Sequence, residues 1–244
     1  MYMYRENDGS EERGVSDRFK TGQVYARLKH LLVSQKVPPH TKLDAGILAQ
    51  RLSMSRTPVR EALIHLAIED VILNIPGSGY FSKPLNVEEI AEDYDLALTI
   101  LRHVIDADME MVRKVHLGLP KFPVFSTPSA DHADIALLFK DFIEELYEGV
   151  AKMAGNRKYQ QVVHAFNSRT GLVRYLDLQR PDRFTQIADD MGELVELLDR
   201  RQAKGAIANL NRQFKSKIDI LYELVKEGNL RSANASANWL NLLD

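Results

Sequence analysis

Two arginines four residues apart, Arg56 and Arg60, carry the clearest chemistry in this sequence. They follow Ser55, which predicts a helix start because a serine side chain can accept a backbone N–H of the first turn. Pro58 lies early in the same helix, where its missing N–H costs nothing. The spacing places both guanidinium groups on one helix face. A helix start with such donors suits phosphates and guanine edges, so we expect this segment to read double-stranded DNA.

The neighbouring segments predict the elements that position this arginine helix. Apolar residues at helical spacing indicate a helix over 23–35, and Asp44 is expected to cap a second, short helix. Residues 53–55 join the short helix to the arginine helix, which is the helix-turn-helix arrangement. Two β-rich runs on either side of the turn 76–79 predict a hairpin, or wing. Together these elements predict a winged helix-turn-helix domain over residues 18–83.

Charge is distributed unevenly along the chain. Residues 18–83 hold ten Lys and Arg and four acids, a net +6, whereas the whole chain is −2. A basic domain in a mildly acidic protein favours a local surface for a polyanion, although random surface clustering explains the charge alone about as well. Residues 1–17 are polar and rich in charge, and are expected to form a flexible arm.

These residues resemble the winged-helix domain of the GntR family of bacterial transcription regulators. The resemblance covers residues 21–82 and rests on Tyr25, Leu43, Leu48-Ala49, Leu52, the run Ser55-Arg56-Thr57-Pro58-Val59-Arg60-Glu61-Ala62-Leu63, Leu66 and Gly77. It implies a homodimer on a palindromic operator. The residues that it implies for DNA binding, with the wing entering the minor groove, are Ser55, Arg56, Thr57, Arg60, Gly77 and Ser78. Many members carry an arginine early in the second helix, where this chain has Ala45-Gly46, so that DNA contact is expected to be absent.

The remaining residues, 84–244, have the pattern of helices, and no strand or repeat is predicted there. The pattern predicts an antiparallel all-helical bundle, so that the whole chain is mostly α, with helices over 87–115, 131–153, 156–176, 181–201 and 204–226. Bundles of this kind build ligand pockets between facing helices. We expect this domain to bind an effector and to dimerise.

The order of these helices, together with Ala154-Gly155-Asn156, resembles the FCD-type effector domain of the FadR branch of the family. That branch commonly holds a metal ion with one aspartate and three histidines. Alignment on Asn156 puts Ile143, Tyr147, Met191 and Gln213 at those positions. Isoleucine cannot coordinate a metal, so no metal and no other cofactor is predicted. The pocket is instead expected to take a small organic effector, such as a carboxylate or acyl compound, directly.

Several polar residues of this domain are candidates for lining such a pocket. The residues predicted to bind effector are Tyr147, His164, Asn167, Arg169, Met191 and Gln213. Arg174 and Tyr175 are interpreted as surface or packing residues, and an isolated histidine is more often a surface or packing residue than a ligand.

The sequence lacks the marks of several other protein classes. It has no cysteine, no apolar run of membrane-spanning length and no signal peptide, so a cytoplasmic protein without a membrane partner is expected. It has no Gly-rich phosphate loop and no nucleophile elbow, so an enzyme is not expected. The predicted function is a ligand-responsive repressor. The alternatives are a DNA-binding dimer whose bundle binds no effector and a helical enzyme with an appended DNA-binding module.

Overall fold

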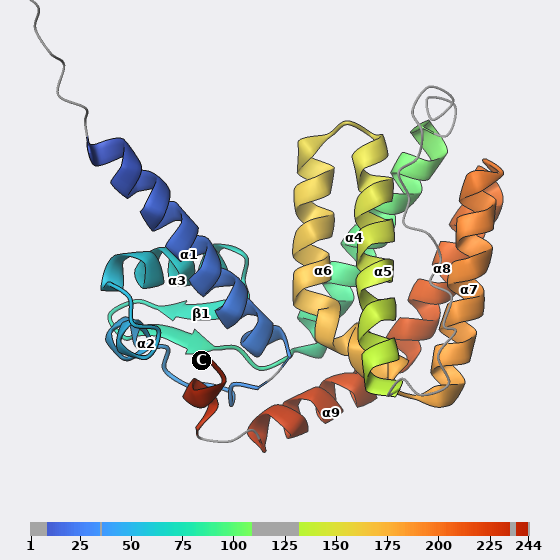
Figure 1. Cartoon of the computed structure of the whole chain (residues 1–244). Helices are drawn as coiled ribbons and strands as arrows, with labels where there is room; N and C mark the ends of the chain where they lie inside the picture. The colour runs from blue at the N-terminus through green and yellow to red at the C-terminus, as the bar shows by residue number, and fades with distance from the viewer. Residues whose placement is uncertain (1–8, 35, 109–131, 235–237, 244) are drawn as a thin grey trace, which may run out of the picture. The chain divides into compact units, whose positions relative to one another are not determined.

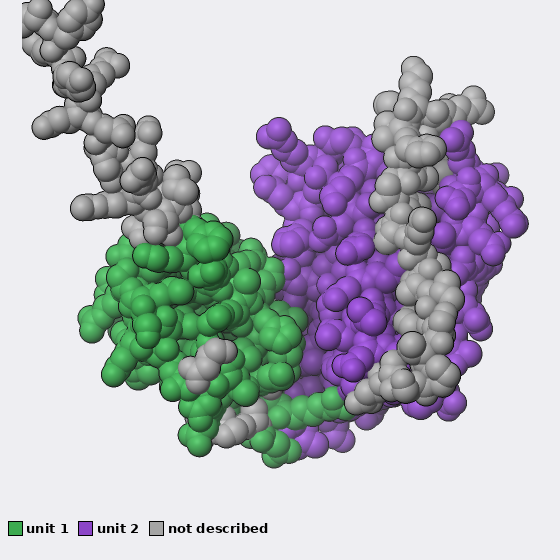
Figure 2. Space-filling view, viewed as in Figure 1, with its two compact units in different colours: residues 1–84, 231–244 green, residues 85–230 purple. Residues whose placement is uncertain are grey.

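The computed structural model describes residues 9–34, 36–108, 132–234 and 238–243, with the side chains of 9–18 left out (Figure 1). The chain divides into two compact units, which are coloured separately in Figure 2. Unit 1 comprises residues 1–84 and 231–244, and unit 2 comprises residues 85–230. Each unit has its own hydrophobic core.

The N-terminal part of unit 1 forms the helices α1 (Gly9–Val33), α2 (Ala45–Arg51) and α3 (Arg56–Ile68). The apolar stripe of α1, including Val24 and Leu28, is fully buried against the inner face of α3. The helix begins at Gly9, much earlier than the predicted start at residue 23. Residues 9–17, expected to be part of a flexible arm, therefore lie in α1, and good helix formers such as Glu and Arg allow the helix to continue there. Residues 1–8 of that arm lie outside the described residues.

The wing is a two-stranded antiparallel sheet of β1 (Ile72–Ile75) and β2 (Gly79–Ser82). Its register pairs the ends of the strands, Ile72 with Ser82 and Ile75 with Gly79. Ile72 is buried in the core of unit 1. The hairpin is therefore fixed to the helices at its base, while its turn is exposed.

The C-terminal segment completes the core of unit 1. The short 3-10 helix η2 (Trp239–Leu243) packs on α1 and α2 and buries Trp239 and Leu243. Arg27 donates to the carbonyl of Leu243 at 2.9 Å, and the buried hydroxyl of Ser232 donates to the carbonyl of Val37 at 2.9 Å. Residues 231–244 were expected in the helical domain. They lie in unit 1 because their apolar side chains fill its core.

Unit 2 is built from α4 (Val87–Asp108), α5 (His132–Met153), α6 (Arg157–Leu178), α7 (Pro181–Asp199), α8 (Ala203–Asp219) and most of α9 (Leu221–Ala233). α4 packs against α5, α6 and α8, while α7 packs against α6 and α8 (Figure 1). Each helix turns an apolar face inward, as the predicted helical periodicity requires. The loop predicted around 116–130 lies outside the described residues.

The last predicted helix, 204–226, is interrupted at Ile220 and forms two helices, α8 and α9. The break turns Leu221, Leu224 and Val225 into the core of unit 2. No glycine or proline marks it, so periodicity alone did not reveal it. The predicted fold class is confirmed: a mostly helical chain with an N-terminal winged helix-turn-helix and a helical second domain. Within the described ranges, no helix is long and apolar enough to cross a membrane.

Candidate DNA-binding and effector sites

The turn between α2 and α3 sets the position of the arginine helix. Asp44 caps α2, as predicted, by accepting the backbone N–H groups of Gly46 at 2.8 Å and Ile47 at 3.0 Å. These two hydrogen bonds hold the pKa of the Asp44 carboxyl below its usual value. In the turn, Ser53 adopts a left-handed conformation with φ of 52°, which reverses the chain within three residues. The start of α3 is therefore fixed by the backbone of the turn.

The N-terminal part of α3 presents polar side chains to solvent. Arg56, Thr57 and Arg60 are exposed, while Val59 and Leu63 on the opposite face are fully buried. Ser55 occupies the N-cap position, but its side chain makes no capping hydrogen bond, which corrects that detail of the prediction. Its extended backbone, with ψ of 161°, starts the helix, and its hydroxyl is left exposed. α3 thus combines a buried anchor with an exposed start that bears two guanidinium groups.

Gly46 provides the space in which the Arg56 guanidinium lies. A Cβ added at Gly46 would meet the Asp44 carboxylate at 3.0 Å and the Arg56 guanidinium nitrogen at 3.4 Å. A larger side chain there would press on both groups. Many family members carry an arginine where this chain has Ala45-Gly46. Here the small Gly46 lets the Arg56 guanidinium lie close to the start of α2.

The wing turn places its small residues in the open. Gly77, with φ of 76°, and Ser78 are both exposed, and Ser78 donates its backbone N–H to the carbonyl of Ile75 at 2.9 Å. A positive φ favours glycine, because a Cβ is strained there. The narrow, exposed turn can approach a nucleic-acid backbone closely. The DNA-binding residues of the prediction thus lie at the start of α3 and at the wing turn of unit 1.

Replacing Arg60 by alanine is expected to weaken operator binding by about 1–3 kcal/mol if its guanidinium reads a base. Arg56→Ala should have an effect of the same order. Gel shifts on one operator fragment at fixed salt would measure both. Arg200→Ala is a matched control, because Arg200 is an exposed arginine of unit 2. Unchanged affinity in both α3 variants would contradict the assignment of α3 as the reading helix.

Unit 2 contains a small cavity between α4, α5, α6, α7 and α8. Its volume is about 30 Å³, and two of the residues predicted to bind effector, Tyr147 and Gln213, line it. Burial raises the pKa of Tyr147 to about 12, so its hydroxyl stays protonated at neutral pH. The other lining residues are Tyr94, Ile143, Arg174, Arg183, Gln186, Ile187, Asp190, Ser216 and Lys217.

The polar wall of this cavity is organised around a fully buried carboxylate, Asp177. Arg183 donates two hydrogen bonds to it, at 2.8 and 2.9 Å, and the buried Lys217 ammonium contacts its second oxygen. Burial disfavours the charge of Asp177, yet Arg183 and Lys217 hold its pKa below the usual value. Burial lowers the pKa of Lys217 to about 8, although the charge of Asp177 opposes this shift.

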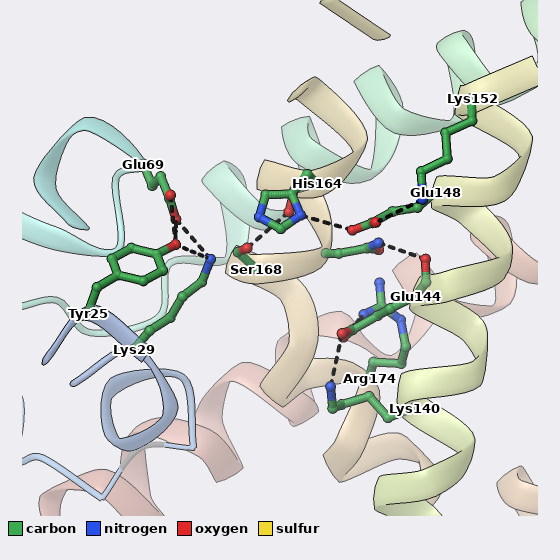
Figure 3. Close-up of polar contacts among 11 residues, drawn as sticks. Tyr25, Lys29, Glu69, Lys140, Glu144, Glu148, Lys152, His164, Ser168 and Arg174 are labelled. Atoms are coloured by element: carbon green, nitrogen blue, oxygen red, sulfur yellow. Dashed lines mark hydrogen bonds and ion pairs between the residues drawn. The ribbon is translucent and has the colours of Figure 1, made fainter. Parts of the chain in front are cut away.

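Arg174 is the third cation of the cavity wall and is only 3% exposed. It donates to Glu144 at 2.7 Å, a residue drawn beside it in Figure 3, and to Thr170 at 3.1 Å. Its guanidinium also lies over the Phe166 ring, 5.3 Å from the centroid. Arg174 was interpreted from sequence as a surface or packing residue. The available signal was its spacing: Thr170, Arg174 and Asp177 continue the buried face of α6 with polar groups.

The other residues predicted to bind effector do not line this cavity. His164 is exposed and pairs with Glu148 at 2.9 Å on the outside of the bundle (Figure 3). Arg169 pairs with Asp93, and Asn167 is buried and donates to the carbonyl of Glu144 at 3.0 Å. Met191 is fully buried in the core of unit 2. The packing of α6 and α7 turns these four side chains away from the cavity. Sequence spacing does not give the rotation of a helix about its axis, so the prediction placed them wrongly.

The donor set of the cavity does not suit a divalent metal ion. Ile143 and Gln213 stand at two of the aligned ligand positions, and Arg174, Arg183 and Lys217 line the same space. Three cations repel a further cation, and a divalent ion needs several anionic or imidazole ligands. Among the described residues, no group of three or more histidines and carboxylates is placed to hold a metal.

Comparison with known proteins finds similarity to transcription regulators in sequence and in fold. Residues 20–81 match the family model of bacterial regulatory proteins of the gntR family. Over 209 residues the chain is 22% identical to the Nta operon transcriptional regulator of Aminobacter aminovorans, covering 84% of this chain and 98% of that protein. It is 19% identical to the uncharacterised HTH-type regulator YdhC of Bacillus subtilis, covering 84% of this chain and 92% of that one. These relatives are transcription regulators, which agrees with the prediction that the chain is not an enzyme.

Solved structures share the fold. E. coli McbR/YncC is 18% identical, with a TM-score of 0.58 over 84% of this chain and 97% of its own. A GntR regulator from Rhodococcus sp. RHA1 is 14% identical, with a TM-score of 0.61 over 83% of this chain and 97% of its own. The succession of a winged-helix domain and a helical domain is therefore shared with these structures over most of the chain.

Proposed function

We propose that this chain, a GntR-family transcriptional regulator with a helix-turn-helix domain, binds a palindromic operator as a homodimer and represses transcription until a small organic effector enters its helical domain. The observation that carries the proposal is the exposed start of α3, where Arg56 and Arg60 share one helix face, together with the exposed wing turn of the same unit. The match of residues 20–81 to the family supports the same role for these side chains.

Dimerisation follows from how such a domain reads DNA. One reading helix covers one half-site, so a palindromic site requires two copies related by two-fold symmetry. The helical domain is proposed to supply most of the dimer interface, because the winged domain is small. The relative from Aminobacter aminovorans is named as the regulator of an operon, which supports control of an operon here too. A regulator of this kind acts in the cytoplasm, on double-stranded DNA.

The effector is proposed to enter the cavity that Tyr147 and Gln213 line. Its wall combines aromatic and aliphatic groups with a few charged donors, which is the usual composition of a small-molecule site. FCD-type regulators use a metal there, but the donor set of this cavity supports direct contact between effector and side chains. In the alternative, a bundle that serves only for dimerisation, these buried charges would have a structural role alone.

The dimer on DNA can be tested with a selected operator and sedimentation. DNA selected by the chain from a random pool should contain two inverted half-sites about one helical turn apart, and the complex should have the mass of two chains on one duplex. Affinity should fall steeply with salt, because phosphate contacts release counterions. A fragment with one half-site is the control and should bind much more weakly. A monomer at micromolar concentration, with and without DNA, would contradict the proposal.

A further inference from the structure

We propose that Ile64 of α3 reads a thymine in each half-site of the operator, by packing its side chain on the thymine C5-methyl group in the major groove. The inference rests on the proposed function and deepens it, because it names a further base that the reading helix recognises. Three features of α3 carry it: the exposure of Ile64, its place on the same face as Arg60, and the hydrogen bond that turns the neighbouring acid toward α1.

Ile64 is a large apolar side chain that meets solvent on a helix whose inner face is already filled. It is 45% exposed, whereas Leu63 and Leu66 beside it are fully buried. Leu63 and Leu66 therefore anchor α3 in unit 1, and the outer part of Ile64 remains open to a partner. Single exposed apolar side chains are common on protein surfaces, so the position of Ile64 along the helix decides its role.

That position continues the face of α3 that carries the polar residues predicted to bind DNA. Ile64 follows Thr57 by seven residues and Arg60 by four, so at about 3.6 residues per turn the three side chains lie within about 60° of arc. Along the helix axis, Thr57 and Ile64 are about 10.5 Å apart, which fits a major groove about 12 Å wide. The reading helix of a homeodomain places its base contacts at the same spacing. Ile64 is therefore within reach of the base edges that Thr57 and Arg60 face.

The acid next to this face is turned toward α1. The Thr21 hydroxyl of α1 donates to the Glu61 carboxylate at 2.8 Å, and Glu61 and His65 line a groove between α1 and α3. A carboxylate in the middle of the reading face would repel the phosphates of DNA. Its hydrogen bond to α1 leaves Arg60 and Ile64 as neighbours on the side of α3 that can enter a groove.

The chemistry of isoleucine points to thymine. Its side chain has no hydrogen-bond donor or acceptor, so it can distinguish bases only by apolar contact. Among the base edges in the major groove, the C5-methyl group of thymine is the apolar one. A β-branched side chain has few rotamers, so the contact orders little side-chain freedom. Since the Arg60 guanidinium suits the two acceptors of a guanine, we expect each half-site to hold a thymine close to a guanine.

Deoxyuridine in the operator tests the contact, because uracil lacks the methyl group and keeps the hydrogen-bonding groups of thymine. The full chain selects an operator from a random DNA pool, and each thymine is then replaced symmetrically in both half-sites. Affinity is measured by fluorescence anisotropy at fixed salt. We expect one thymine position at which the replacement weakens binding about fourfold per half-site, the effect of exposing one buried CH₂-sized group.

Two alanine variants assign the contact to one residue. Ile68 is the matched control, because it is an isoleucine of the same helix, is 76% exposed, and lies about 16.5 Å beyond Thr57 along the axis, outside the width of the groove. Ile64→Ala should lose the preference for thymine over deoxyuridine, while Ile68→Ala should keep it. The salt dependence of binding should not change in Ile64→Ala, because no phosphate contact is removed. Thermal unfolding of both variants checks that unit 1 stays folded.

The comparison between variants removes any effect of uracil on the DNA itself. A thymine preference that is the same in the wild type and in Ile64→Ala, or that both variants lose, would overturn the assignment to Ile64. Equal binding of thymine and deoxyuridine by the wild type at every position would also overturn it. In each of these cases operator binding, and with it the proposed function, would stand. A chain that selects no operator sequence would contradict the proposed function and the inference together.

Discussion

Asp177→Asn should lower the free energy of unfolding of the helical unit by about 3–5 kcal/mol, the usual cost of removing one partner from a buried ion pair. Asparagine keeps the shape of the side chain and removes its charge. Arg183 and Lys217 would then face each other without the carboxylate that both contact. Chemical denaturation followed by far-UV circular dichroism would measure the loss, because the single tryptophan of the chain, Trp239, lies in the other unit.

Asp219→Asn provides the matched control, since Asp219 is paired with Lys215 in an exposed position. Exposed ion pairs contribute about 0–1 kcal/mol, so this variant should unfold almost like the wild type.

The loss of unfolding free energy in Asp177→Asn should also shrink when the pH is raised from about 7 to about 9.5. In the wild type burial lowers the pKa of Lys217 to about 8, so over this range the wild type loses the attraction between the Lys217 charge and Asp177 that the variant already lacks. Equal stability of the two variants at pH 7 would refute the central role of Asp177.

Trp239→Ala should destabilise the winged unit by about 3–5 kcal/mol, the range for truncating a large buried aromatic side chain. Trp239 is 5% exposed and packs in the core that holds α1 and α3 together. Operator binding should weaken with it, because α3 depends on that core for its position. Calorimetry is the suitable measurement, since the substitution removes the tryptophan fluorescence of the chain.

Leu242→Ala is the control for this prediction. Leu242 belongs to the same 3-10 helix but is 53% exposed, so its truncation leaves no buried cavity. A melting profile of Trp239→Ala that matches that of Leu242→Ala would show that the C-terminal segment adds nothing to the winged unit.

The winged unit was largely predictable because its signals are local. The Asp44 cap, the hairpin turn and the arginine helix follow from residue types over a few positions, and the structure has all three elements. The placement of η2 was not predictable, because its contacts join residues more than two hundred positions apart, as in the hydrogen bond from Arg27 to Leu243. Apolar periodicity gives no partner for a five-residue segment.

The cavity was predicted less well than the fold around it. Tyr147 and Gln213 line it as expected, but they came from alignment with a family pattern and not from any local signal. The buried charges around Asp177 were missed, since charged residues are seldom buried and a helix surface is the usual place for them. Their burial depends on pairing between α6, α7 and α8, which one sequence does not specify.

The discontinuity of the winged unit has a consequence for biosynthesis. A chain emerging from the ribosome presents α1, α2 and α3 early, but Trp239 and Leu243 are made only after the helical unit. Until then the apolar surface that they cover is open to water and to other chains, and contacts between distant segments form slowly. The nascent protein therefore completes its DNA-reading domain only after the helical domain has been synthesised. A newly made regulator would gain full operator affinity only once η2 has been synthesised, and not while the helical unit is still being translated.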